Sequence, residues 1–171
     1  MNRHIAAVAV LMLALAAGGC GFHPLYARAD SSAGGHQVFN SIYVEPIDAE
    51  RVGYELRDSL IDLLAGTPSP QAARYRLTVA VKQTIEGTAV ETTGSITRYS
   101  YTMVANYDLR DTRTGADVTK GTESTVSAYD VVASPYATLV AQQDAQKLGA
   151  HDIADRIRID LGVYFSKPSG G

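Results

Sequence analysis

Hydrophobic and polar residues alternate one by one along the middle of the chain, as in strands that bury one face and expose the other. The pattern predicts strands over Arg74–Ile85, Ile96–Asp111 and Asp117–Tyr129, with Asp111–Gly115 as a turn between the last two. The apolar face of the first two strands collects Tyr75, Leu77, Val79, Val81 and Ile85 with Tyr99, Tyr101, Met103, Ala105, Tyr107 and Leu109. So long an alternation favours antiparallel pairing.

Two other segments repeat their apolar residues at helical spacing. The first covers about Asp48–Ala65, where Asp48 is a candidate N-cap and Gly66 a stop signal. The second covers about Pro135–Tyr164, with Ser134 as the N-cap and Pro135 at the first helical position. Gly149 lies in the middle of this helix and indicates either a kink or close packing.

A further strand is predicted over Val38–Ile47, with Pro46 ending its pairing or marking a sheet edge. The predicted element order is therefore β-α-β-β-β-α. Both helices have an apolar stripe and the sheet has one apolar face, so both helices should pack on that face. The expected fold class is α+β, a two-layer sandwich with a mostly antiparallel four-stranded sheet.

The N-terminal segment has the pattern of an export signal. Ile5–Ala17 is apolar and uncharged, and too short for a membrane span, so residues 1–19 are interpreted as a signal peptide. The small residues that follow it lead to Cys20, an arrangement that resembles the bacterial lipobox and implies lipidation of this cysteine. We then expect a lipidated N-terminus and flexible tether over residues 20–37, one domain over 38–165, and a disordered tail over 166–171.

Cys20 is the only cysteine among the 171 residues. The alternative to lipidation is an ordinary secreted protein with an incidental thiol. A single cysteine has no disulfide partner in an oxidising compartment, which favours the lipoprotein interpretation. Gly21 follows the cysteine, and the absence of Asp there implies, by resemblance, the outer rather than the inner membrane.

Charge and motifs exclude several classes of function. The net charge of −3 gives no general attraction to nucleic acid. His23, His36 and His151 show no metal-ligand spacing, and no phosphate-binding glycine loop or G-x-S-x-G motif occurs. We therefore predict no catalytic residues, no metal site and no cofactor.

Two surface features remain as candidates for binding. The tyrosine stripe on Ile96–Asp111 is either an exposed recognition surface or sheet core beneath the helices, and core is the more ordinary arrangement. The opposite face of the sheet carries Arg76, Lys82 and Arg98. These residues are either solvated charges or contacts for anionic groups such as glycolipid phosphates.

Two stretches carry a resemblance to a known family. Gly19–Tyr26 reads GCGFHPLY, and Tyr129–Ala137 reads YDVVASPYA with Asp144-Ala145 downstream. Both resemble the lipopolysaccharide-assembly lipoprotein LptE (RlpB) family, whose two-layer fold has the same element order.

The resemblance implies a non-enzymatic outer-membrane lipoprotein, anchored on the periplasmic side, that assists assembly of the LptD β-barrel, plugs it and binds lipopolysaccharide. Lys82, Arg98 and Arg76 are then the candidate lipopolysaccharide contacts. The polar connection Glu86–Ser95 is the candidate tip inside the barrel, with Val90, Thr92 and Thr93 as contacts. The alternatives are a free-standing periplasmic lipoprotein that binds a small ligand or another envelope protein, and an enzyme with a dispersed site.

Overall fold

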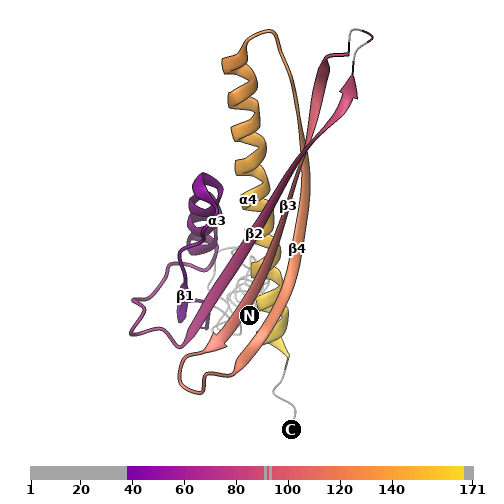
Figure 1. Cartoon of the computed structure of the whole chain (residues 1–171). Coiled ribbons are helices and arrows are strands. Elements are labelled where there is room, and N and C mark those ends of the chain that lie inside the picture. Colours follow the sequence, from indigo (N-terminus) through magenta and orange to yellow (C-terminus); the bar gives the residue numbers. More distant parts are fainter. Residues whose placement is uncertain (1–37, 91, 93, 168–171) are drawn as a thin grey trace, which may run out of the picture. The chain divides into compact units, whose positions relative to one another are not determined.

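The computed structural model describes residues 38–90, 92 and 94–167, and within them the element order is the predicted β-α-β-β-β-α (Figure 1). The elements are β1 (Ile42–Val44), α3 (Glu50–Leu63), β2 (Tyr75–Val90), β3 (Ile96–Asp111), β4 (Asp117–Asp130) and α4 (Pro135–Ser166). The strands form one sheet in chain order; β1 is parallel to β2, and the other neighbours are antiparallel. The α+β class is confirmed.

Several predictions fall outside the described residues: the signal peptide over 1–19, Cys20 with the tether to residue 37, and the tail from residue 168. Ser166, assigned to the tail from the sequence, is the last residue of α4. No helix among the described residues is long and apolar enough to cross a membrane.

The core lies between one face of the sheet and the two helices. The strands contribute alternate residues to it, among them Leu77, Tyr101, Met103, Tyr107 and Leu109, all buried. The tyrosine stripe is therefore core rather than an exposed recognition surface, although Tyr99 at its end is only partly buried and stacks on Tyr129 with ring centroids 5.5 Å apart.

The first strand is shorter than predicted. Val38 and Phe39 are helical instead of extended, and the Ser41 N–H bonds the Val38 carbonyl at 3.0 Å. Their apolar character reflects burial of Phe39 in the core and not strand pairing. The last bond to β2 runs from the Glu45 N–H to the Leu77 carbonyl at 3.0 Å. Pro46 follows and has no N–H to continue the ladder.

Helix α3 begins and ends differently from the prediction. Its N-cap position is Ala49, with no side-chain cap, so Asp48 does not cap it. At its C-terminus Ala65 has a positive φ of 62°, and the Gly66 N–H reaches back to the Ile61 carbonyl at 2.8 Å. With the Ala65 N–H on the Asp62 carbonyl, these bonds form a Schellman motif that satisfies the last carbonyls of the helix.

The second strand runs five residues further than Ile85. Glu86–Val90, predicted as part of a polar connection, is paired with β3, and the register shifts only after Gly87. A Cβ on Gly87 would come within 2.9 Å of Cδ1 of Ile96. The glycine that looked like a loop signal is therefore a close-packing position inside a long hairpin.

Helix α4 matches its prediction closely. The Ser134 hydroxyl accepts the Ala137 N–H at 3.4 Å, and Pro135 opens the helix. The helix is continuous through Gly149, where a Cβ would lie 3.4 Å from Tyr101, Met103 and Thr125 side chains. Of the two interpretations of Gly149, close packing on the sheet is the one that the structure supports.

Candidate functional site

The face of the sheet turned away from both helices, here called the outer face, is polar and built from small side chains. Its cross-strand rows follow from the register: Lys82 lies opposite Val104 and Val104 opposite Ser124, while Ala80 lies opposite Asn106 and Asn106 opposite Thr122. A shallow hollow of about 500 Å³ covers the second of these rows and the neighbouring row, in which Asp108 lies opposite Thr78 and Lys120; Lys82 is not part of its lining. Its outer-face lining includes Thr78, Ala80, Asn106, Asp108, Lys120 and Thr122.

The three basic residues predicted as lipopolysaccharide contacts do lie on this face, but they are spread along it. Arg76 lies opposite Arg110, Lys82 opposite Val104, and Arg98 is on β3 itself. At about 3.4 Å per residue, roughly 20 Å separates each from the next. They therefore cannot bind one anionic group together.

The same residues differ in their own partners. Arg76 pairs with Glu45 at 2.9 Å and stands 6.0 Å over the Tyr43 ring, and Arg98 pairs with Asp130 at 3.6 Å. Within the described residues Lys82 makes no ion pair. It is an exposed cation in the middle of the outer face with its charge uncompensated.

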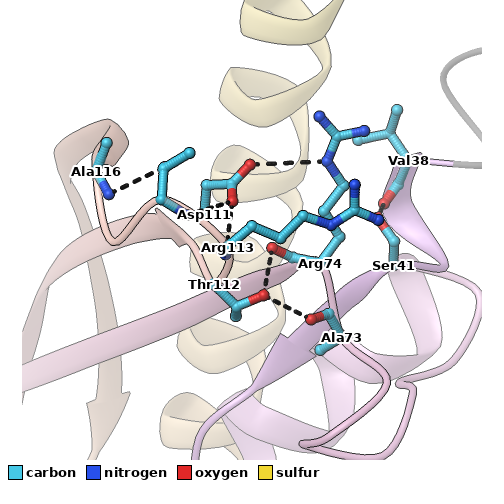
Figure 2. A network of polar contacts seen from close by, with 9 residues as sticks. Val38, Ser41, Ala73, Arg74, Asp111, Thr112, Arg113 and Ala116 are labelled. Carbon is cyan, nitrogen blue, oxygen red and sulfur yellow. Dashed lines mark hydrogen bonds and ion pairs between the residues drawn. The ribbon is translucent and has the colours of Figure 1, made fainter.

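The proximal end of the sheet, where the β3–β4 turn lies, is held by a polar network (Figure 2). The Thr112 hydroxyl donates to the carbonyls of Ala73 and Arg74 at 2.8 and 3.0 Å. Asp111 accepts N–H bonds from Arg113 and Thr114, which lower the pKa of its carboxyl, and Arg74 lies 3.7 Å away. These bonds tie the chain before β2 to the turn after β3, so the network is structural.

A carboxyl pair sits between β4 and α4. The Tyr107 hydroxyl donates to Oδ2 of Asp160 at 2.9 Å, and Glu123 of β4 faces the same carboxyl. Burial and then Asp160 raise the pKa of Glu123. Burial and then the hydrogen bond to Asp160 raise the pKa of Tyr107. No group of three or more His, Cys, Asp or Glu side chains in the described part of the chain could hold a metal ion.

The distal end of the sheet, at the β2–β3 hairpin, carries exposed apolar residues. Val90 ends β2 opposite Ile96 and is 62% exposed, and Thr92 lies exposed in the turn; Thr93 is outside the described residues. Beside them is an open hollow of about 570 Å³, lined by Ile96, Tyr99, Val131, Val132, Pro135 and others. Sequence reasoning missed the contribution of Val131–Pro135 to this end, because nothing in the local pattern places that junction against the hairpin.

A comparison with protein-family models covers most of the described residues. The model of the LptE family, described as lipopolysaccharide-assembly, matches residues 39–161. Among solved structures, a protein described as a lipoprotein from Caulobacter crescentus CB15 is 29% identical, with a TM-score of 0.66 over 80% of this chain and 98% of that one.

Two more distant structures share the fold. The rare lipoprotein B of Shewanella oneidensis is 14% identical, with a TM-score of 0.55 over 72% of this chain and 92% of its own. A minor lipoprotein of Acinetobacter baumannii is 15% identical, with a TM-score of 0.56 over 76% of this chain and 98% of that chain. None of the curated proteins matches the chain.

Proposed function

The chain belongs to the LptE family of lipopolysaccharide-assembly lipoproteins, which are not enzymes, and from this premise we propose its specific role. It is an outer-membrane lipoprotein, anchored through Cys20 on the periplasmic side. It assists assembly of the LptD β-barrel, occupies the barrel lumen as a plug, and binds lipopolysaccharide on its way to the outer leaflet.

The observation that carries this proposal is the polar outer face with Lys82 at its centre. The lumen of a large outer-membrane barrel is polar, so a face of small Thr, Ser and Asn side chains suits it. An ammonium group without an ion-pair partner is suited to a phosphate of lipopolysaccharide, since a charge-assisted hydrogen bond is among the stronger polar contacts.

The three candidate contacts take different roles in this proposal. Lys82 is the leading contact. Arg98 is a second one, because its pair with Asp130 is long and exposed, and such surface pairs contribute little. Arg76 is held by Glu45 and Tyr43 and serves mainly to fix β1 against β2.

The test is the affinity of the purified protein for lipopolysaccharide. Lys82→Glu should lower that affinity about ten- to a hundredfold, because a hydrogen bond to a charged group contributes roughly 1.5–3 kcal/mol and each 1.4 kcal/mol is a factor of ten. Lys147→Glu is the matched control: it makes the same charge reversal at an exposed position of α4, away from the outer face, and should change the affinity less than about twofold. Equal losses for both variants would mean that only overall charge matters.

The barrel part of the proposal needs a separate measurement. The tagged full-length protein, purified from outer membranes in mild detergent, should bring a large β-barrel with it in equal amount, and mass spectrometry should find acyl groups on Cys20. Cys20→Ala should lose the acyl groups, and the protein that is not bound to the barrel should leave the membrane fraction. A lipidated protein that purifies alone would support the alternative, a free-standing lipoprotein that binds a small ligand or another envelope protein.

A further inference from the structure

Among the residues that the structure describes, one edge of the sheet is left unpaired along most of its length. Strand β1 pairs only with Tyr75–Leu77, and the chain then turns away at Pro46. From Thr78 onward, β2 has β3 on one side and no described strand on the other. Figure 1 shows β2 continuing far past the end of β1 toward the hairpin.

The direction of the backbone groups identifies which residues are unpaired on that side. The Tyr75 N–H bonds the Ser41 carbonyl at 3.1 Å, and the Leu77 carbonyl accepts from Glu45, so both residues point their backbone groups toward β1. These groups alternate in direction along a strand. The N–H and C=O groups of Val79, Val81, Gln83 and Ile85 therefore point toward the open edge.

This edge has few of the features by which soluble proteins protect an exposed edge. Such edges are usually short, carry charged side chains such as Lys, or are interrupted by Pro, a bulge or inward-pointing charges. Here the register is regular from Thr78 to Gly87, and the first shift lies beyond Gly87. The segment has no proline, and its charged residues, Lys82 and Glu86, are both on the outer face.

The side chains along the edge define the pattern of a strand that would fit it. On the inner face Val81 is half-buried and Ile85 is 42% exposed, so apolar side chains would cover them. On the outer face Lys82 and Thr84 are exposed, so polar side chains would join them. The fitting strand alternates apolar and polar residues, as strands of outer-membrane barrels do. The regular segment is also about as long as one such strand, roughly 9–11 residues.

We propose that the open edge Thr78–Gly87 binds, by strand addition, one transmembrane strand of the partner barrel before that strand has paired with its neighbours. This proposal rests on the assembly role proposed above, and it names the surface and the backbone groups that perform it. Main-chain bonds to the four edge residues supply the affinity, and the alternating side chains supply the selection.

The direct test uses the unmodified full-length protein in detergent micelles and a synthetic peptide of alternating apolar and polar residues, about as long as one transmembrane strand. Amide NMR should show shifted signals and slower hydrogen exchange at Val79, Val81, Gln83 and Ile85. The even-numbered neighbours, already bonded to β3, should change little. A peptide of the same composition without alternation, and one N-methylated on its bonding edge, should not bind. If the four edge amides show no selective change, strand addition at this edge is wrong.

A pair of variants separates the contribution of the Val81 backbone N–H to peptide binding from the contribution of its side chain. Val81→Pro removes one outward N–H, which an edge strand tolerates, and should weaken peptide binding at least tenfold. Val81→Ala keeps the N–H and should change binding less than about threefold. If Val81→Pro is unfolded by circular dichroism, the amide measurements on the unmodified protein decide the question.

Two outcomes distinguish strand addition from the proposed barrel-plug function on which it rests. A protein that still co-purifies with the barrel but never binds the peptide would overturn strand addition and leave the plug role intact. Self-association of the protein, lost in Val81→Pro and accompanied by no peptide binding, would show that the edge pairs with a second copy instead.

Discussion

The carboxyl groups of Glu123 and Asp160 form a protonation-sensitive contact where α4 crosses β4. The charged groups around Glu123 are Asp152, Arg156 and Asp160 on α4, and the Tyr107 hydroxyl from β3 also bonds Asp160. Burial, together with hydrogen bonding to Asp160 and the repulsion of its charge, favours the protonated form of Glu123 and raises its pKa. Arg156 opposes this shift, while it also bonds Asp152 at 3.2 Å.

This contact predicts a pH dependence of stability. A carboxyl whose pKa is raised on folding binds its proton more tightly in the folded state. Its contribution to stability is therefore fully present below the ordinary glutamate pKa and is lost as the pH rises through the raised value. Glu123→Gln keeps a donor for Asp160 but does not titrate, so it should melt higher than the natural protein at pH 8, by roughly 1–3 °C, and lose that advantage at pH 4.

The measurement is thermal unfolding from pH 4 to pH 8 with Glu86→Gln, at an exposed position of β2, as the control. A constant difference between Glu123→Gln and the natural protein at every pH would contradict the assignment.

At the scale of the elements, two helical glycines mark contacts of different tightness. In α3 a Cβ on Gly53 would lie 2.3 Å from the Ile47 carbonyl oxygen, which is backbone and cannot move aside without distorting the chain. In α4 a Cβ on Gly149 would make contacts of 3.4 Å with three side chains, which is within ordinary packing distance. Of these two positions, Gly53 therefore requires glycine, while Gly149 leaves room for a Cβ.

We expect alanine substitutions at these glycines to have opposite effects on the free energy of unfolding. Gly149→Ala should raise it by up to about 1 kcal/mol, because alanine favours the helix by roughly that amount. Gly53→Ala should lower it by about 1–3 kcal/mol, because the overpacking forces backbone to shift. Urea unfolding of the two variants measures both, and effects of the same sign would show that the contact distances do not control them.

Regular, long elements could be predicted from the sequence, and short or non-local features could not. Ile96–Asp111 and the start of α4 at Pro135 were predicted correctly, because many residues repeat one pattern there. Glu86–Val90 looked like a loop from its polar residues and glycine, but pairing with β3 makes it strand. Val38 and Phe39 looked like strand, although burial rather than pairing explains their apolar side chains.

In the candidate site, too, the local features could be predicted from the sequence and the long-range features could not. Alternation alone placed Arg76, Lys82 and Arg98 on the outer face. Their spacing and partners depend on the register between strands: Glu45 comes to Arg76 through the β1–β2 pair, and Asp130 comes to Arg98 through the β3–β4 pair. Register is a long-range property, so local patterns could not show that Lys82 alone of the three lacks an ion pair among the described residues.

The two ends of the sheet differ in a way that suits one of them to contact a partner. The proximal end is cross-linked by Arg74, Asp111 and Thr112, and its polar groups bond one another (Figure 2). The distal end exposes Val90 at the hairpin and Val132, Tyr136 and Leu139 at the junction with α4. The proximal end also exposes Val163 and Tyr164 of α4, so the distal end is distinguished by its exposed hairpin and by the absence of such a polar network among the described residues. Exposed apolar groups at such a tip are typical of an interaction site.

This difference predicts where association with the barrel is sensitive to charge. Val90→Asp combined with Thr92→Asp places two carboxylates at the distal tip, and burying an unpaired charge in an interface costs far more than burying a methyl group. The amount of barrel that co-purifies with the tagged protein should fall at least about fivefold, while lipopolysaccharide binding through Lys82 should persist in the purified variant. Gln71→Asp combined with Ala72→Asp, at exposed positions of the loop before β2, is the matched control and should leave co-purification unchanged. If the tip variant retains the barrel and the control loses it, the proximal end enters the contact, and the hairpin must be assigned to the opposite side of the complex.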